Sequence, residues 1–407
     1  MLTSNIRIAF RHIWQNKLYS SINVIGLAVG ISCVLLAVLY WKDERSFDSF
    51  HKKSRDLYRI TTSLVENKAA QRHTSGGTGQ VQGPAFKAGV PEITDYTRIF
   101  GGGIASDVRA GDKSLRLQIL FADDNFLNLF DFPLLHGDPQ TVLKDLGSVI
   151  ITEATAIKFF NTTNVVGKQL ELDADPSAQR LGKPMLITGV VKNLPANSSI
   201  QFDLLLPMKF AQLSFEDNNW LDAYLSTFVL LRPNADMIAV IRKFNRIYAE
   251  HAPEQIARNI KDYGFNPEIS YGLQPLKDIH LHPLGSSMES GIVNGSSPAF
   301  SYLFMGIAAF ILLMASINFV NISMADSLKR GKEVGVRKIT GGSRIQIIMH
   351  FLLESAILCM MAFLLAILLI AFALPVFNDL AGKQIVIGNA VGGTLLLDFM
   401  AVLAIIV

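Results

Sequence analysis

The chain has 407 residues, of which 50% are hydrophobic and 17% charged, and its formal net charge is +3. A single soluble domain of this length would be unusually apolar, whereas a few membrane spans joined to one large soluble domain fit the composition. The small net charge gives no support to nucleic acid as a partner. Cys33 and Cys359 both lie in apolar runs, so they cannot form a disulfide framework for an extracytoplasmic domain.

The N-terminal region predicts an amphipathic helix followed by a membrane span. In residues 1–20, apolar residues recur at helical spacing between Arg7, Arg11 and Lys17, which is typical of a helix at the inner membrane surface. Residues 21–41 have about the length that a spanning helix needs, and no small-residue cleavage site follows them, so we interpret the span as an uncleaved anchor. The positive residues before the span place the N-terminus in the cytoplasm.

Gly26 and Gly30 form a GxxxG pair within this first span. One interpretation is a close contact between helices, including dimerisation. The other is the ordinary tolerance of glycine in membrane helices.

Residues 42–298 contain no apolar run long enough to span a membrane, and they predict a large α+β domain. Its length allows two subdomains, and turn signals such as Gly101-Gly102-Gly103 divide it. The predicted strands are residues 57–65, 115–121, 148–152, 185–191, 202–206 and 226–231. The predicted helices are residues 84–89, 153–160 and 237–250.

Two groups of residues in this domain suggest ligand sites only weakly. The glycine-rich residues 76–79 lack the lysine of a phosphate loop, so we interpret them as a flexible loop. His280 and His282 alternate as on one strand face, but a metal site needs more ligands, so a surface or packing role is preferred. The chain contains no GxxxxGK[ST] loop and no signal for catalysis, and we expect neither enzymatic activity nor a bound cofactor.

Further apolar runs predict three more spans. The second is residues 299–325, and the third is residues 347–375, ending at Pro375. A short linker, residues 376–389, leads into residues 390–407, which have about the minimum spanning length. Because the chain stops within this last run, we expect a fragment with further sequence beyond it. The predicted fold class is an α-helical transmembrane domain of four spans, the last truncated, with a large α+β periplasmic domain inserted between the first and second spans.

The loop between the second and third spans, residues 326–346, is strongly basic. Its cations far outweigh its acidic residues, and the positive-inside rule therefore places it in the cytoplasm, in agreement with the N-terminus. The domain of residues 42–298 and the linker of residues 376–389 then face outward. The cations are Lys329, Arg330, Lys332, Arg337, Lys338 and Arg344.

Polar residues inside the spans have two interpretations each. Asn318 and Asn321 share one helix face, either as hydrogen-bonding glue between helices, which we prefer, or as a polar seam that shifts during a cycle. Glu354 and His350 lie in the first turns of the third span. Glu354 could belong to an ion path, but pairing with the adjacent Arg/Lys cluster is the preferred interpretation.

Several motifs in series resemble the FtsX-like permeases of the MacB type, the membrane subunits of ABC transporters that work by mechanotransmission. Residues 318–355, NFVNISMADSLKRGKEVGVRKITGGSRIQIIMHFLLES, closely resemble the signature of that family. Other stretches that agree with the family, including those that resemble its periplasmic core domain, are residues 44–60, 121–139, 151–160, 187–203 and 275–283. The sequence departs from the pattern at Ser199, where relatives often carry histidine, and at Gly342, where alanine is common.

The resemblance implies a function in the inner membrane with an ABC ATPase of the MacB or LolD kind as partner. That ATPase, which would carry ATP and Mg²⁺, is expected to dock on the cytoplasmic loop and to move the periplasmic domain, driving export or extraction of a peptide, antibiotic or lipoprotein. A second permease unit in the same chain or a dimer partner, and membrane lipid, are the other expected partners. The expected coupling residues are Arg330, Glu333, Gly335, Arg337, Lys338 and Gly341.

Three other functions are alternatives to the permease. A membrane-anchored sensor would carry a signalling domain after its second span, whereas this chain has a basic loop and more apolar sequence there. A membrane-bound hydrolase has no support in the soluble domain. Regulation of cell-wall enzymes stays open as a role of the same membrane architecture.

Overall fold

The computed structural model describes residues 11, 14, 17–65, 72–172, 175–284, 290–293, 295–331, 335–336, 339 and 343–386. The chain divides into two compact units. The first, here called the helical unit, comprises Met1–Arg45 and Pro298–Val407, and the second, the sheet unit, is Ser46–Ser297.

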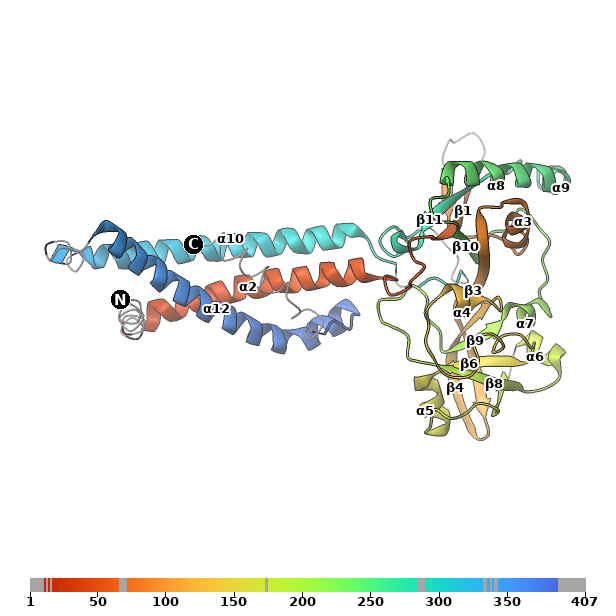
Figure 1. Ribbon diagram of the computed structural model, residues 1–407, viewed down its shortest axis with the longest axis horizontal. Helices are drawn as coiled ribbons and strands as arrows, with labels where there is room; N and C mark the ends of the chain where they lie inside the picture. Colours follow the sequence, from red (N-terminus) through yellow and green to blue (C-terminus); the bar gives the residue numbers. More distant parts are fainter. Residues whose placement is uncertain are drawn as a thin grey trace. The chain divides into compact units, whose positions relative to one another are not determined.

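Three long helices, α2 (Lys17–Ser46), α10 (Pro298–Lys329) and α12 (Arg344–Ala381), form the described part of the helical unit (Figure 1). Each of them is long and apolar enough to cross a membrane. Buried apolar side chains from all three, such as Leu27, Leu312 and Ala362, pack into one cluster. Most of the predicted N-terminal helix and the whole predicted fourth span, residues 390–407, lie outside the described residues.

The helix α12 does not end at Pro375, contrary to the prediction. It begins with a capping box, in which the Ser343 hydroxyl accepts from the Gln346 backbone N–H. It ends at Ala381, six residues after Pro375, and Gly382, whose φ is 62°, caps this end. Proline removes one backbone hydrogen bond, but membrane helices tolerate it where packing continues. Ile370 and Leu374 pack into the helical cluster immediately before Pro375, and this packing supports the helix there.

The described residues of the sheet unit form one mixed sheet of eleven strands and several short helices. The strands are β1 (Leu57–Val65), β2 (Arg72–Ser75), β3 (Ile93–Ala110), β4 (Lys113–Ala122), β5 (Leu134–His136), β6 (Ser148–Thr152), β7 (Gln169–Leu172), β8 (Met185–Val191), β9 (Leu204–Pro207), β10 (Ser226–Leu231) and β11 (Glu268–Pro275). The helices are α3 (Gln82–Gly89), α4 (Phe126–Leu129), α5 (Glu153–Phe160), α6 (Pro176–Leu181), α7 (Met208–Gln212), α8 (Met237–His251), α9 (Pro253–Tyr263) and the 3₁₀ helix η1 (Leu276–Asp278).

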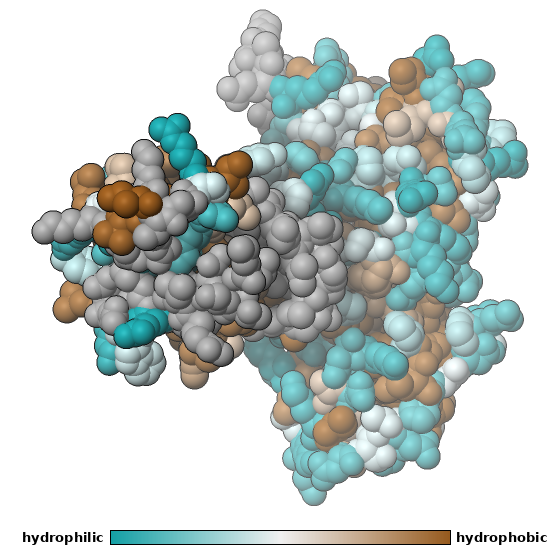
Figure 2. Space-filling view, turned by 60° about the vertical axis from the view of Figure 1, so that its left-hand side comes forward, coloured by the Kyte–Doolittle hydropathy of each residue, from teal (hydrophilic) through white to brown (hydrophobic). Residues whose placement is uncertain are grey.

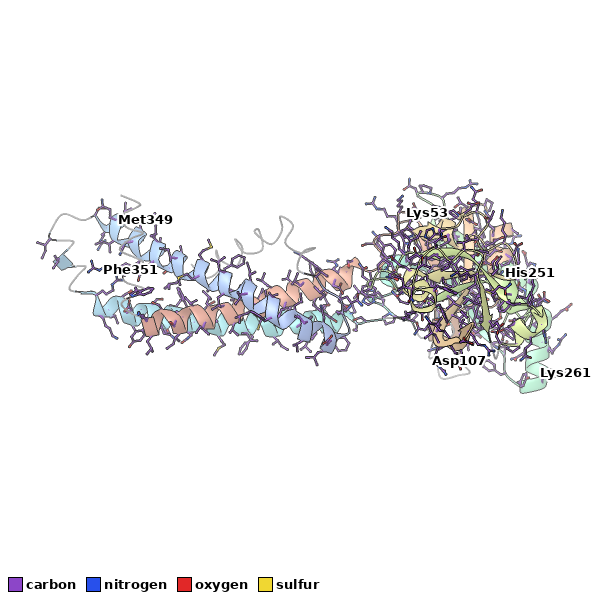
Figure 3. The ribbon with its side chains drawn as sticks, turned by 90° about the horizontal axis from the view of Figure 1, so that it is seen from below. Lys53, Asp107, His251, Lys261, Met349 and Phe351 are labelled. Carbon is purple, nitrogen blue, oxygen red and sulfur yellow. The ribbon has the colours of Figure 1, made fainter. Side chains whose placement is uncertain are left out.

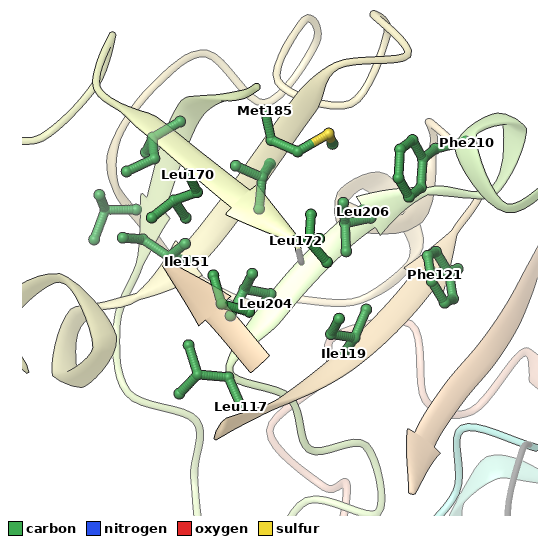
Figure 4. Close-up of a cluster of buried hydrophobic side chains, with 14 of the residues drawn as sticks. Leu117, Ile119, Phe121, Ile151, Leu170, Leu172, Met185, Leu204, Leu206 and Phe210 are labelled. Atoms are coloured by element: carbon green, nitrogen blue, oxygen red, sulfur yellow. The ribbon is translucent and has the colours of Figure 1, made fainter. Parts of the chain in front are cut away.

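The strand order in the sheet is β11-β1-β10-β3-β4-β9-β6-β8-β5, with β2 beside β1 and β7 beside β3 and β8. The pairs β4–β9 and β6–β8 are parallel, and the other pairs are antiparallel. Three clusters of buried apolar side chains pack on this sheet, and Figure 4 shows the one that contains Leu117, Ile119 and Leu204. Hydrophilic residues cover much of the face of the sheet unit seen in Figure 2. The two predicted subdomains stay a prediction, because one sheet carries all three clusters.

The glycine run Gly101-Gly102-Gly103 is not a turn, contrary to the prediction. It lies inside β3, the longest strand, where the register with β4 shifts between Gly101 and Ile104. Gly101 and Gly102 have φ values of 107° and 72°, and a Cβ on Gly101 would lie 2.5 Å from the Ile119 carbonyl oxygen. Glycine is therefore needed for a bulge that bends the strand, and the bulge hides the strand from a reading of sequence pattern.

Candidate functional site

The predicted coupling residues lie at the end of α10 and just beyond it. The structure describes Arg330 and Gly335, whereas Glu333, Arg337, Lys338 and Gly341 lie outside the described residues. Gly335 has helical backbone, and a Cβ added to it would meet nothing within 4 Å. Within the described part of the chain, packing therefore gives no reason for glycine at this position.

Arg330 is fastened inside the helical unit. Its Nη1 donates to Glu354 Oε2 of α12 at 2.9 Å, and the two side chains are only 10% and 11% exposed. Its guanidinium also lies 5.4 Å from the ring centre of Phe351, which Figure 3 labels near the end of the helices. Glu354 thus pairs with the basic cluster, as the preferred interpretation held. Because its charge is compensated here, Arg330 joins the start of the basic loop to α12.

Lys329, the residue before Arg330, contacts the remaining helix of the unit, α2. Its Nζ donates to the Tyr19 hydroxyl at 3.2 Å and lies 4.7 Å above the same ring, near the start of α2. Cations over aromatic faces are favourable contacts, although exposed ones contribute only modestly. The last residues of α10 therefore contact both other helices immediately before the basic loop.

The glycine pair of α2 faces α10. A Cβ on Gly30 would lie 3.1 Å from Ala315 Cβ and 3.3 Å from Leu312 Cα, whereas a Cβ on Gly26 would meet only Asn318 Nδ2, at 3.9 Å. Small residues allow membrane helices to approach closely, and Gly30 is the position where this approach is tight. The contact is made within one chain.

Asn318 and Asn321 are exposed on α10. Among the described residues, no hydrogen bond joins their side-chain amides to α2 or α12. The interpretation as glue therefore finds no partner in these two helices.

A second charged contact lies after the end of α12. The Lys383 ammonium donates to Glu44 near the end of α2 and lies 3.1 Å from Asp43 Oδ2. The Glu44 side chain is fully buried. Sequence reasoning missed this contact because it placed Lys383 in an outward linker and had no signal connecting it to α2. Ion pairs thus join α10 to α12 by way of Arg330, and α2 to α12 by way of Lys383.

In the sheet unit, the residues that follow α2 are held by the segment of residues 193–200. Asp48 donates its backbone N–H to the Asn197 carbonyl at 3.0 Å, and its Oδ1 accepts from the Ser199 backbone N–H at 2.9 Å. Asn197 Nδ2 donates to the Ser46 hydroxyl at 2.9 Å. Burial raises the pKa of Asp48, although the hydrogen bonds from Ser199 act in the opposite direction. The contact uses the backbone of Ser199, so the departure from the family pattern at this side chain leaves it intact.

His280 packs against Phe47, one of the residues that follow α2. Its ring stacks on Phe47 with 3.3 Å between centroids and an interplanar angle of 6°. His280 is buried and His282 follows it in a turn after η1, so the predicted shared strand face is wrong. The strand β11 ends at Pro275, and both histidines lie after η1, where the backbone is not extended. Because its ring is buried and stacked on Phe47, His280 has the packing role that the sequence favoured.

His51 joins a third segment to this region. Its Nδ1 accepts from the Asp131 backbone N–H at 2.9 Å, and Lys52 donates its backbone N–H to Asp131 Oδ2 at 2.7 Å. The ring lies among Phe130 and Phe132 and is 1% exposed. Burial lowers the pKa of His51 to about 4. Residues 46–52, here called the joint, therefore lie where four stretches that are far apart in the sequence meet.

The glycine-rich residues 76–79 cover a buried arginine. A Cβ on Gly76 would lie 2.2 Å from Arg59 Cζ, and Arg59 Nη2 donates to Gln274 Oε1 at 2.6 Å. Thr78 is buried and donates its backbone N–H to the Leu225 carbonyl at 2.7 Å, so the prediction of a flexible loop is wrong here. Burial lowers the pKa of Arg59 to about 10. The glycine makes room for a guanidinium of the protein itself.

Two family models match the chain. The MacB-like periplasmic core domain matches residues 20–247, and the FtsX-like permease C-terminal region matches residues 305–407. The first match alone covers more than half of the chain.

Similar proteins carry transporter names. The ABC transporter permease YknZ of Bacillus subtilis is 22% identical over 377 residues, which cover 90% of this chain and 85% of YknZ. The macrolide export ATP-binding/permease protein MacB of Bdellovibrio bacteriovorus is 27% identical over 167 residues, covering 38% of this chain and only 26% of that protein. A solved domain of a permease protein from Porphyromonas gingivalis has 25% identity and a TM-score of 0.46, over 55% of this chain and 91% of the domain. The chain belongs to the family of ABC transporter permeases that have a MacB-like periplasmic core domain and an FtsX-like permease region.

Proposed function

We propose that this chain is a permease subunit that transmits the work of a separate ATPase across the membrane and carries out no reaction of its own. The proposal rests on the contacts that join the end of α10 to the other two helices immediately before the basic loop. Arg330 pairs with Glu354 of α12, and Lys329 contacts Tyr19 of α2. A force applied to the loop therefore acts on three helices together.

The ATPase is proposed to dock on the cytoplasmic side of the inner membrane, where the N-terminus and the basic loop lie. Arg337 and Lys338 would pair with acidic groups of the ATPase, since charge-assisted hydrogen bonds are the stronger ones. Arg330 itself serves as an internal link. ATP and Mg²⁺ are bound by the ATPase, and a second permease unit or a second copy of the chain completes the transporter. The proposed docking residues are Glu333, Gly335, Arg337, Lys338 and Gly341.

The joint is proposed to pass motion of α2 to the periplasmic sheet unit. The helix α2 runs to Ser46, and the next residues are buried and hydrogen-bonded to Asn197 and Ser199. Buried, tightly packed segments move with their surroundings. A displacement of Ser46 would therefore also displace the residues of the sheet unit that are hydrogen-bonded to it and its neighbours. Export or extraction of a peptide, antibiotic or lipoprotein is the proposed outcome.

Reversal of charge in the loop tests the coupling. The double variant Arg337→Glu/Lys338→Glu should abolish stimulation of the ATPase in proteoliposomes while membrane insertion stays intact. Arg344→Glu is the matched control. It reverses a charge of the same loop at the first residue of α12, and Arg344 is not one of the proposed docking residues. Unchanged ATP turnover in the double variant would contradict the coupling role.

Labelling of single cysteines tests the orientation. In a chain whose Cys33 and Cys359 are replaced by alanine, Lys261→Cys on exposed α9 should react with an impermeant maleimide in spheroplasts, and Lys332→Cys in the loop should be protected. Protection of Lys261→Cys together with labelling of Lys332→Cys would reverse the proposed orientation.

A further inference from the structure

An open groove of about 440 Å³ lies in the sheet unit between the helix α9 and residues 217–221, which precede β10. Its volume falls within the roughly 300–1,000 Å³ that ligand sites usually have. Carboxamide, carboxylate and guanidinium groups make up most of its lining. Ligand sites are more often lined mainly by apolar groups, so this polar lining narrows the class of molecule that the groove fits.

The two walls of the groove are tied to each other by Gln255 of α9. Its Oε1 accepts from the Trp220 backbone N–H at 2.7 Å, and its Nε2 donates to the Asn218 carbonyl at 3.0 Å. Within the opposite wall, the Asn219 backbone N–H donates to Asp217 Oδ1 at 2.7 Å. A site whose walls are already held in place loses less conformational freedom on binding, so this groove is pre-organised for a ligand.

Several polar groups of the lining are available to a ligand. The exposed side chains of Asn218, Arg258 and Asp262 make no hydrogen bond or ion pair with other residues in the part of the chain that the structure describes. Asn259 Nδ2 donates to the Phe265 carbonyl at 2.7 Å, which leaves its Oδ1 as an acceptor. Donors and acceptors therefore occur together, since an amide offers both, a guanidinium donates and a carboxylate accepts.

The lining also contains an aromatic ring. Tyr263, the last residue of α9, has a side chain that is 80% exposed. A tyrosine ring combines an apolar face with a polar hydroxyl, and such rings are enriched where one part of the contact is apolar and the other is wet. Gln255, Asn259 and Asp262 lie on the same side of α9, because residues three or four apart are neighbours on a helix. The helix therefore presents hydrogen-bonding groups beside an exposed ring.

The lining argues against several classes of ligand. An anion would meet the carboxylates of Asp217 and Asp262, and a cation would meet the guanidinium of Arg258. An apolar ligand would cover the amides without offering them partners. A neutral molecule meets the conditions if it has several hydroxyl groups, each of which donates and accepts, and an apolar C–H face for Tyr263. A pyranose ring has both features.

We propose that this groove binds a neutral oligosaccharide. One pyranose ring stacks on Tyr263, and its hydroxyl groups exchange hydrogen bonds with Asn218, Arg258 and Asp262. The site goes beyond the proposed function, because it requires neither an ATPase nor movement of the helices. With the sheet unit on the outer side of the membrane, as proposed above, the groove would face the glycans of the cell envelope.

Isothermal titration calorimetry of the purified full chain in lipid nanodiscs tests the proposal. Nanodiscs are used because the headgroups of glycoside detergents are themselves sugars and would compete. The probes are cellotetraose, chitotetraose and, as a polar molecule without a sugar ring, tetraglycine. At least one of the two oligosaccharides should bind about tenfold more tightly than tetraglycine. Absence of binding by both oligosaccharides, or equally tight binding of tetraglycine, would overturn the proposal.

Two matched pairs of variants on α9 locate the site. Tyr263→Ala removes the ring and should weaken binding of the tighter oligosaccharide about tenfold, whereas Ile260→Ala, at an exposed apolar residue outside the lining, should leave it unchanged. Arg258→Ala should weaken binding about fivefold, and Lys261→Ala, at an exposed cation outside the lining that Figure 3 labels, should not. All four side chains are exposed, and circular dichroism checks that each variant folds. Equal affinities within either pair would overturn the site.

A comparison of the two oligosaccharides identifies the kind of sugar. Both consist of β-linked pyranose rings, but chitotetraose carries acetamido groups where cellotetraose has hydroxyl groups. Tighter binding of chitotetraose would assign the site to acetamido sugars, and equal or tighter binding of cellotetraose would show that hydroxyl groups suffice. Either result supports a site for a neutral oligosaccharide. No ATPase is present in these titrations, so a failure of the proposed coupling would leave their outcome unchanged.

Discussion

The two units of the protein bury their side chains in different ways. The sheet unit buries large rings against each other, as where Phe130 meets Phe228 with 5.1 Å between centroids. The helical unit instead brings small residues such as Gly30 and Ala315 together, and fastens its helices by ion pairs. Water drives burial in the first case, whereas lipid supplies no such force between helices in the second.

The same contrast holds at the surfaces of the two units. The helical unit exposes large apolar side chains, including Phe372 at 75% and Leu364 at 61%, as a lipid-facing surface does. In the sheet unit most large apolar side chains are buried in its three clusters. A well-packed core resists deformation, while helices joined by a few close contacts can shift. The difference favours movement among the helices of the helical unit over deformation of the sheet unit's core.

Phe228→Ala tests the aromatic core and should have the largest effect. The side chain is fully buried in β10, and the substitution should lower the free energy of unfolding of the sheet unit by about 3–5 kcal/mol. Urea unfolding of the full chain in detergent, followed by hydrogen exchange of the strands, measures it. Phe215→Ala, at a ring that is 48% exposed, should cost less than about 1 kcal/mol. Similar losses for both variants would remove the first half of the comparison.

Glu354→Gln tests the ion pair that holds the helical unit. It leaves the buried guanidinium of Arg330 without its carboxylate and should destabilise the helical unit by about 3 kcal/mol. The double variant Arg330→Met/Glu354→Met should recover much of that loss, because apolar residues can replace a buried pair. Thermal denaturation in detergent, analysed as a double-mutant cycle, measures the coupling. Additive losses would show that the pair does not hold α10 to α12.

The pH dependence of the sheet unit tests the burial of His51 in the joint. Its folded pKa of about 4 lies below the usual 6.5, so the unfolded chain binds the proton more readily between these values. The stabilisation is full above pH 6.5 and is lost as the pH falls toward 4, by up to about 3 kcal/mol. His51→Gln should remove this part of the pH dependence of unfolding, while His73→Gln, at an exposed ring, should not. An unchanged profile in His51→Gln would contradict the prediction.

A comparison of Gly30→Ala with Gly26→Ala tests the close contact of α2 with α10 and should have the smallest effect. The added methyl group is crowded at Gly30, with 3.1 Å to Ala315 Cβ, but makes an ordinary contact at Gly26, with 3.9 Å to Asn318. Gly30→Ala should therefore be less stable than Gly26→Ala by about 1 kcal/mol. The yield of a disulfide engineered between α2 and α10 reports the separation. Equal yields would show that the helices do not depend on this approach.

Short periodic segments could be predicted from the sequence almost to the residue. Residues 57–65, 148–152 and 226–231 were predicted as strands and have these bounds in β1, β6 and β10. Each is a run of apolar and β-branched residues with clear breaks on both sides, so local pattern determines it. The strand β3 escaped prediction because its glycines, which form a bulge, carry the signature of a turn.

Long-range contacts could be predicted only where charge or motif suggested them. Glu354 was expected to pair with the basic cluster, since both lie near the same end of the membrane helices, but its choice of Arg330 depends on packing. Lys383 with Glu44, and His51 with Asp131, join segments far apart in the chain, and no local pattern connects them.

The guanidinium of Arg59 occupies the space into which a side chain at position 76 would project. A larger residue at position 76 therefore requires the Arg59 side chain to move or to be replaced. A relative with alanine or a larger residue in place of Gly76 should carry a shorter residue in place of Arg59. Gly76→Ala should accordingly destabilise the sheet unit more in the presence of Arg59 than in an Arg59→Ala background.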